Sequence, residues 1–309
     1  MSKENTAVTK KKIKRCKEDV VFDAACFIIL TLVLFVVAYP LYWVIISSIS
    51  APSAVSSGKV LLHPIGFTLK GYAEVFKNDQ VMRGFLNSLI ITFCGVMVNL
   101  IVTLPTSYAL SRSNFSGKKP ITIFYLITMF FCGGLIPTYL VIQRLQMLNT
   151  IWALILPGCL SVYNMIVART FFKSNISEEL YEAAEIDGCT QARFFFQIAL
   201  PLSKAIIAIL VLYYGVGHWN SYFSALVYIS DKAKYPLQLV LRNILITNQT
   251  ALSQTATTAA ARAALQEKQQ LIDVMKYSLI IISSIPVLVM YPLVQKHFVK
   301  GVMIGSMKG

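Results

Sequence analysis

The chain has 309 residues, of which 56% are hydrophobic and only 14% are charged, and its mean hydropathy is +0.64. A soluble domain carries about a quarter charged residues, so this composition excludes an ordinary soluble protein. The net charge of +14 could suggest nucleic acid as a partner. However, the basic residues stand between apolar runs and do not form one basic face, which is the arrangement typical of membrane proteins.

Apolar runs of the length needed to cross a bilayer recur six times. A membrane-spanning helix needs about 20 mostly apolar residues, because its backbone polar groups must be satisfied within the segment. We therefore predict an all-α polytopic membrane protein with six transmembrane helices. The expected spans are residues 21–47, 85–110, 121–141, 151–171, 205–228 and 277–294.

The distribution of Lys and Arg predicts the orientation. With both termini in the cytosol (N-in/C-in), the cytosolic segments hold 17 of the 28 basic residues, as the positive-inside rule requires. The expected parts are a basic cytosolic tail (1–20), a six-helix permease domain (21–294) and a cytosolic C-terminal tail (295–309). The permease domain includes outer segments 50–84 and 230–276 and a cytosolic loop, 176–201.

The cytosolic loop contains an unusual cluster of acids in the stretch "SEELYEAAEIDGCTQARFFFQIALP". Five of the chain's 14 carboxylates lie within ten residues there. Ser177 is a suitable helix N-cap, Gly188 a suitable stop and Thr190 a second N-cap, so we predict a helix, a glycine turn and a second helix. Either the acids form a solvated charged face, or they surround a small-residue face that docks on a basic partner.

The same stretch carries a family resemblance. "EAAEIDGCTQARFFFQIALPL" resembles the EAA loop of binding-protein-dependent ABC importer permeases, with Cys189 in a position where alanine is usual. "NSLIIT", "GGLIPTYLV", "WNSYF" and the tail "FVKGVMIGSMKG" extend the likeness over nearly the whole chain. The chain is most similar to the MalG-type carbohydrate permeases, in the LplC/YtcP-like branch linked to complex oligosaccharides.

This resemblance implies a type I ABC importer permease fold and a set of partners. These are a second homologous permease, two copies of a cytosolic ABC ATPase, an extracytoplasmic solute-binding protein and a sugar. The first helix of the loop is then a coupling helix, and Glu182 matches the carboxylate that pairs with a basic residue of the ATPase. The positions that match the family motif are Glu182, Ala183, Ala184, Asp187, Gly188, Ile198, Leu200 and Pro201.

The chain lacks the residues that ATP hydrolysis requires. A phosphate-binding loop needs the pattern G-x-x-x-x-G-K-[ST], and "SGKV" and "SGKK" lack both the first glycine and the Ser or Thr. We therefore expect a non-catalytic subunit that binds no cofactor, with ATP and Mg²⁺ used by the partner ATPase. No cysteine spacing resembles a zinc site, and we expect no metal ligands.

Polar and aromatic residues within the predicted spans are candidates for lining a sugar pathway, because rings pack on sugar C–H groups and polar tips bind hydroxyls. Such residues also commonly make hydrogen bonds between membrane helices, so both roles remain open. Tyr214, His218 and Tyr222 have the spacing of one helix face. The candidates are Asn87, Tyr214, His218, Trp219, Asn220 and Tyr222.

The sequence thus predicts half of the pore of an ATP-driven oligosaccharide importer in the plasma membrane of a bacterium. The alternatives are a permease for a non-sugar solute and an ion-coupled secondary transporter. A secondary transporter often has an ionisable residue within the membrane and repeated halves, and neither is evident. A membrane enzyme would need a convergent catalytic site, which the polar residues of the spans do not supply.

Overall fold

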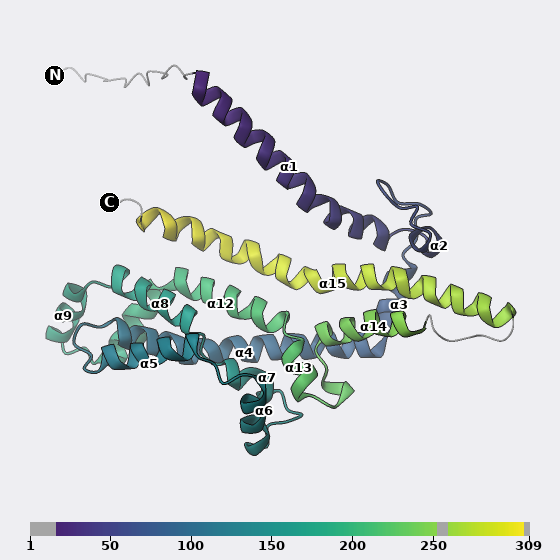
Figure 1. Ribbon diagram of the computed structural model, residues 1–309. Coiled ribbons are helices and arrows are strands. Elements are labelled where there is room, and N and C mark those ends of the chain that lie inside the picture. Colours follow the sequence, from purple (N-terminus) through teal and green to yellow (C-terminus); the bar gives the residue numbers. More distant parts are fainter. Residues whose placement is uncertain (1–16, 252–258, 306–309) are drawn as a thin grey trace.

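The computed structural model describes residues 17–251 and 259–305 of the chain. Within these ranges the protein is helical and contains no β-strand. Figure 1 shows an elongated bundle of helices, from which the first helix diverges. Residues 1–16 of the expected N-terminal tail and 306–309 of the expected C-terminal tail lie outside the described residues.

Within the part of the chain that the structure describes, three helices are long and apolar enough to cross a membrane without interruption. They are α1 (Lys17–Ser48), α4 (Asp79–Ser111) and α15 (Ala259–Gly305), whose apolar part is Gln269–Pro292. They correspond to the first, second and sixth spans expected from the sequence. α15 begins well before residue 277, so part of the expected outer segment 230–276 belongs to this helix.

The other three candidate spans are pairs of helical segments that meet at a bend. α5 (Lys118–Phe130) meets α6 (Leu135–Arg144) at 113°, and the short α7 (Trp152–Ile155) with η1 (Leu156–Gly158) meets α8 (Val162–Asn175) at 52°. α12 (Lys204–Trp219) meets the segment Gln191–Leu202 at 80°. By length and composition, the described residues therefore hold three spans, or six if each bent pair counts as one.

The expected fifth span, 205–228, differs most from the structure. α12 ends at Trp219, and residues 223–228 form a separate helix, α13 (Phe223–Tyr228). At the other end, α12 is preceded by α10 (Gln191–Phe194), the π-helical turn η2 (Phe195–Ala199) and α11 (Leu200–Leu202). Pro201 lacks a backbone N–H and follows this π-helical turn, where the regular ladder is already broken.

The two ends of the bundle carry different elements. The short helices α2 (Pro52–Ser56), α3 (Lys70–Lys77) and α14 (Leu237–Ala251) lie towards the right of Figure 1. They pack against α15 or α4, while η3 (Lys232–Lys234) also contacts α4. α9 (Glu178–Ile186) lies at the left end, where α1 begins and α15 ends.

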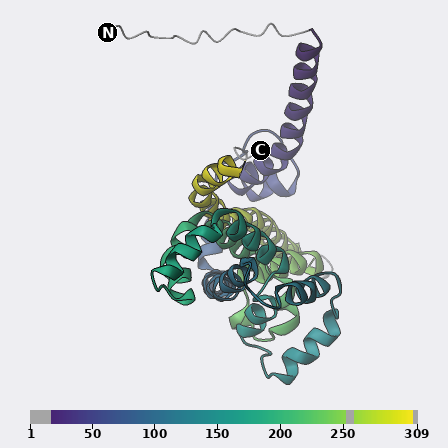
Figure 2. The ribbon, with the colours of Figure 1, turned by 90° about the vertical axis from the view of Figure 1, so that its left-hand side faces the viewer.

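α1 stands apart from the rest of the bundle (Figures 1 and 2). None of the 18 residues in its most apolar window is buried. The helix is attached at its C-terminal end, where Trp43 Nε1 donates a hydrogen bond of 2.8 Å to the Val60 carbonyl. The Trp43 and Tyr277 rings also pack edge to face, with centroids 5.1 Å apart. Most of the length of α1 thus presents apolar side chains outward.

A row of buried polar side chains on α4 holds the broken helices in place. Asn99, Thr103 and Ser107 are each spaced by four residues, so they share one helix face, and all three are fully buried. Asn99 Nδ2 donates hydrogen bonds to the carbonyls of Gly158 (2.8 Å) and Cys159 (2.9 Å), at the break between η1 and α8. We refer to Asn99, Thr103 and Ser107 as the α4 polar row.

The α4 polar row also reaches α12 and α8. His218 Nε2 lies 2.7 Å from Asn99 Oδ1, and Nε2 is the donor because an amide oxygen can only accept. Thr103 shares a hydrogen bond of 2.7 Å with the Tyr214 hydroxyl, which also accepts from the Ser161 amide. Ser107 donates to the Met165 carbonyl at 3.1 Å. One face of α4 therefore fixes three other elements.

Replacing Asn99 tests this role. Asn99→Ala removes the donor that the Gly158 and Cys159 carbonyls share and takes away the buried partner of His218 Nε2, and we expect the free energy of unfolding to fall by about 1–3 kcal/mol. The measurement is denaturant unfolding in detergent. The matched control is Asn175→Ala, because Asn175 is exposed and bonds within its own helix, so its effect should stay within about 0.5 kcal/mol. An equally small effect of Asn99→Ala would contradict the assigned role.

Candidate functional site

The acidic segment folds as the sequence predicts. Ser177 Oγ accepts a hydrogen bond from the Leu180 amide (3.3 Å) at the start of α9, and Thr190 Oγ1 accepts from the Arg193 amide (3.3 Å) at the start of α10. Between the helices, Gly188 has φ +75°, a left-handed conformation that favours glycine. The helix, glycine turn and second helix are therefore confirmed.

One side chain anchors α9 to the bundle. Tyr181 is only 9% exposed, and its ring packs edge to face on Phe194, with centroids 5.3 Å apart. Phe194 and Phe195 are buried in the same cluster with Tyr108 of α4 and Phe172 of α8. Two of the three consecutive phenylalanines thus pack within the chain, whereas Phe196 is 65% exposed.

The opposite face of α9 is exposed, and α9 lies at one end of the molecule (Figure 1). Glu182, Ala183 and Glu185 are exposed, and Ile186 is 87% exposed. An isoleucine so exposed beside an alanine and two carboxylates gives α9 a mixed apolar and acidic surface. We call Glu182, Ala183, Glu185 and Ile186 the outer face of α9.

The residues expected from the family motif divide into two groups. Glu182, Ala183, Asp187, Gly188 and Pro201 are exposed. Ala184, Ile198 and Leu200 are partly buried and pack against the cluster around Tyr181 and Phe194. The first group is available for contact with another protein, and the second fixes the two short helices to the bundle. Their roles in coupling remain predictions.

An ion pair at the start of α9 was not expected from the sequence. The guanidinium of Arg112, at the end of α4, pairs with the Glu178 carboxylate and lies over the Tyr181 ring, 4.1 Å from its centroid. The Ser113 amide donates to the other carboxylate oxygen at 3.1 Å. Partial burial raises the pKa of Glu178, but hydrogen bonds from Ser113 and the charges of Arg112 and Lys118 outweigh it, so the pKa is lowered.

The pore candidates lie in two different environments. Four are engaged within the chain: Tyr214 and His218 bind the α4 polar row, Trp219 Nε1 donates to the Ser283 carbonyl (2.8 Å), and Asn87 Nδ2 donates to the Ala233 and Tyr235 carbonyls. Asn220 and Tyr222 are exposed. Tyr222 does not continue the face of Tyr214 and His218, because α12 ends before it. Pore lining by these residues remains a prediction.

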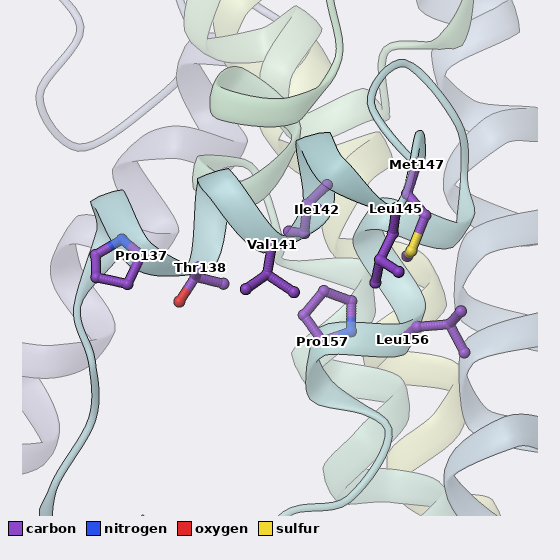
Figure 3. Close-up of a pocket in the computed structure, with 8 residues that line it drawn as sticks. All are labelled: Pro137, Thr138, Val141, Ile142, Leu145, Met147, Leu156 and Pro157. Carbon is purple, nitrogen blue, oxygen red and sulfur yellow. The ribbon is translucent and has the colours of Figure 1, made fainter.

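A hollow of about 420 Å³ lies between α6 and η1 (Figure 3). Its lining comes from α6, the turn after it, and η1, and includes Pro137, Val141, Leu156 and Pro157. Thr138 supplies the single side-chain hydroxyl of this lining. A sugar needs several polar partners for its hydroxyls, so this hollow is unsuited to bind one by itself. None of the pore candidates lines it.

The fold and sequence were compared with known proteins. No protein-family model matches the chain. The polygalacturonan/rhamnogalacturonan transport system permease protein YtcP of Bacillus subtilis is 36% identical over 288 residues, which cover 93% of this chain and 98% of YtcP. Protein LplC of the same organism is 38% identical over 289 residues, covering 94% of this chain and 95% of LplC.

A solved structure has the same fold. A chain in the crystal structure of a bacterial ABC transporter involved in the import of the acidic polysaccharide alginate superposes with a TM-score of 0.82 and 27% identity. The match covers 92% of this chain and 99% of that one. The apolar helices and this likeness define the class, which is a multi-pass membrane permease of an ABC transporter. Within that class, the chain belongs to the family of sugar transport permeases that includes YtcP and LplC.

The lowered pKa of Glu178 leads to a prediction about pH. A carboxyl whose pKa is lower in the folded state contributes stability above its ordinary pKa of 4.5 and loses that contribution as the pH falls through the lowered value. We expect the amides of α9 to lose protection in hydrogen exchange below pH 4.5, after correction for intrinsic rates. Glu178→Gln should remove this pH dependence. An unchanged acid profile in that variant would contradict the contribution of Glu178.

Proposed function

We propose that this chain is one permease subunit of an ATP-driven, binding-protein-dependent importer of oligosaccharides in the plasma membrane of a bacterium. It forms half of the translocation pore together with a second, homologous permease. Two copies of a cytosolic ABC ATPase hydrolyse Mg-ATP beneath the pair, and an extracytoplasmic binding protein delivers the sugar. The chain itself performs no catalysis.

The observation that carries the proposal is the outer face of α9. Glu182 and Glu185 lie beside Ala183 and the 87% exposed Ile186, on a helix anchored by Tyr181 on its other side. Exposed apolar side chains flanked by charges are typical of a protein contact. We infer that this face docks on the ATPase, with Glu182 paired to a basic residue. ATP-driven closure of the ATPase pair then moves α9, so that the pore opens alternately to the outside and to the cytosol.

The placement of the elements supports the proposed topology of six spans with both termini in the cytosol. The start of α1, the end of α15 and α9 lie at one end of the bundle, and α2, α3 and α14 lie at the other (Figure 1). A single assignment of sides thus puts the coupling loop and both termini on the cytosolic side, as the positive-inside rule also favours. Each bent helix pair then counts as one span.

Two of the names, those of YtcP and of the alginate transporter, favour a charged glycan as substrate. Polygalacturonan is a polymer of a uronic acid, and alginate is named as an acidic polysaccharide. A chain with net charge +14 is compatible with an anionic cargo, although most of that charge follows from topology. We therefore propose uronic-acid oligosaccharides as the substrate class. The names give no support to a non-sugar solute or to an ion-coupled transporter.

Uptake into vesicles tests the proposed function. Proteoliposomes that hold both permeases, the ATPase subunits and the binding protein should accumulate digalacturonate only when ATP is supplied to the ATPase side. We expect Glu182→Lys to lower this uptake more than roughly tenfold, because it places a like charge against the basic partner. The ATPase subunits should no longer co-purify with that variant.

Asp79→Lys is the control for charge reversal, because Asp79 is also an exposed helix carboxylate but lies at the start of α4, away from the outer face of α9. It should retain most of the uptake. Uptake of Glu182→Lys at the wild-type rate would exclude the docking role of Glu182. Accumulation driven by an ion gradient without the ATPase would overturn the importer proposal as a whole.

Tyr222 is the aromatic pore candidate that stays exposed. If its ring contacts the sugar, Tyr222→Ala should lower digalacturonate uptake roughly two- to tenfold, the range expected for one aromatic contact. Tyr213→Ala is the control, because the two tyrosines are almost equally exposed (44% for Tyr213 and 43% for Tyr222) and Tyr213 lies outside the candidate set. Equal uptake by both variants would remove Tyr222 from the pathway.

A further inference from the structure

The end of α4 is fixed to two neighbouring helices through its last carbonyl groups. Arg169 Nε of α8 donates to the Leu110 carbonyl at 3.0 Å, and Lys118 Nζ at the start of α5 donates to the Arg112 carbonyl at 3.0 Å. Cations are favourable at this end of a helix, where carbonyls lack intrahelical donors and the helix dipole is negative. The backbone at residue 112 is therefore held firmly.

The side chain of Arg112 extends from this fixed point to α9. It is only 12% exposed, pairs with Glu178 at the first position of α9, and lies over the Tyr181 ring one turn further on. The Ser113 amide binds the same carboxylate. Two donors from adjacent residues at the end of α4 thus hold the beginning of α9.

The packing around this contact is incomplete. A hollow of about 300 Å³ adjoins it, lined among others by Tyr108, Arg112, Phe115 and Tyr181. The neighbouring Glu179 is exposed, and its side chain makes no hydrogen bond or ion pair within the described part of the chain. The bonds of Arg112 and Ser113 to Glu178, with Tyr181, are therefore what attach the first turn of α9 to α4.

We propose that Arg112 is a positioning residue that joins α9 to α4, so that a displacement of α9 moves α4 as one body with it. The α4 polar row then passes this movement to α8 and α12, because Asn99, Thr103 and Ser107 bind both. The rigidity of the joint is a property of this chain alone. Only the statement that an ATPase displaces α9 rests on the proposed function.

The joint can be measured without substrate or nucleotide. Spin labels are placed at Ile101→Cys, an exposed position of α4, and at Leu180→Cys, an exposed position of α9 that is not part of its outer face, with the native cysteines replaced. Double electron–electron resonance on the purified full chain should give one narrow distance distribution. Glu178→Gln and Arg112→Gln should each broaden it, whereas Glu179→Gln, the matched control, should leave it unchanged.

The double variant Arg112→Gln/Glu178→Gln distinguishes one joint from two separate effects. If both residues act through their mutual contact, the double variant broadens the distribution no more than either single variant does. Additive broadening, or a distribution as narrow as the wild type in both single variants, would overturn the proposal. Helical content by circular dichroism should be equal in all variants, which excludes unfolding as the cause.

The assembled transporter provides the second measurement. When nucleotide and vanadate are added to the complex, the distance between the labels should stay constant in the wild type, because α4 follows α9, and should change in Glu178→Gln. A change in the wild type as large as in the variant contradicts the joint. If the ATPase subunits do not bind the wild-type chain, the proposed function fails, while the nucleotide-free distributions still decide whether the joint exists.

Discussion

The broken helices of this protein depend on one requirement, that carbonyl groups freed at a helix break find donors inside the protein. Within hydrocarbon no water can satisfy them. At the break between η1 and α8, both donors come from a single amide group, that of Asn99, whose oxygen then receives His218. The side chain is fully buried, and its three bonds join α4, the broken helix and α12. The bend in this span is thus a stable part of the fold.

The same helix relates the two ends of the molecule. Towards α9, Tyr108 of α4 packs in the aromatic cluster with Phe172, Phe194 and Phe195. Towards the opposite end, Ser88 accepts from the Leu237 amide, and Phe85 packs edge to face on Trp219. α4 therefore contacts elements at both ends of the bundle. Association of helices in lipid relies on such polar and close-packed contacts, because the hydrophobic effect contributes little there.

The sequence predicted the parts of the fold that depend on local properties. Apolar length located α1, α4 and the apolar part of α15, and capping chemistry located α9, its turn at Gly188 and α10. It did not predict the bends, because Gly133, Gly134 and Pro201 can equally be accommodated in a kinked continuous helix. It also placed the end of the fifth span nine residues too late, since the apolar pattern continues from α12 through the interruption at 220–222 into α13.

The sequence predicted the exposed residues of the candidate site but not the contacts that hold the site in place. The exposure of Glu182 and Ala183 agrees with the expected outer face, but Arg112 and Tyr181 were missed. Arg112 is 66 residues from Glu178 in sequence, and a basic residue after an apolar run is already explained by topology. Tyr181 lies between Glu179 and Glu182 in the acidic stretch, and only the tertiary packing shows that its ring points inward. Likewise, the spacing of Tyr214, His218 and Tyr222 could not show that α12 ends at Trp219.

The length of α4 has a consequence for the surrounding lipid. Its 33 residues span about 50 Å at 1.5 Å per residue, whereas the hydrocarbon core of a bilayer is about 30 Å thick. The helix must therefore tilt or extend into the headgroup layers at its ends. When the bilayer becomes thicker or thinner, α4 changes its tilt, and the elements bound along α4 tilt with it. The length of the lipid acyl chains thereby sets the tilt of the helix bundle relative to the bilayer normal, while the hydrogen bonds within the bundle stay intact.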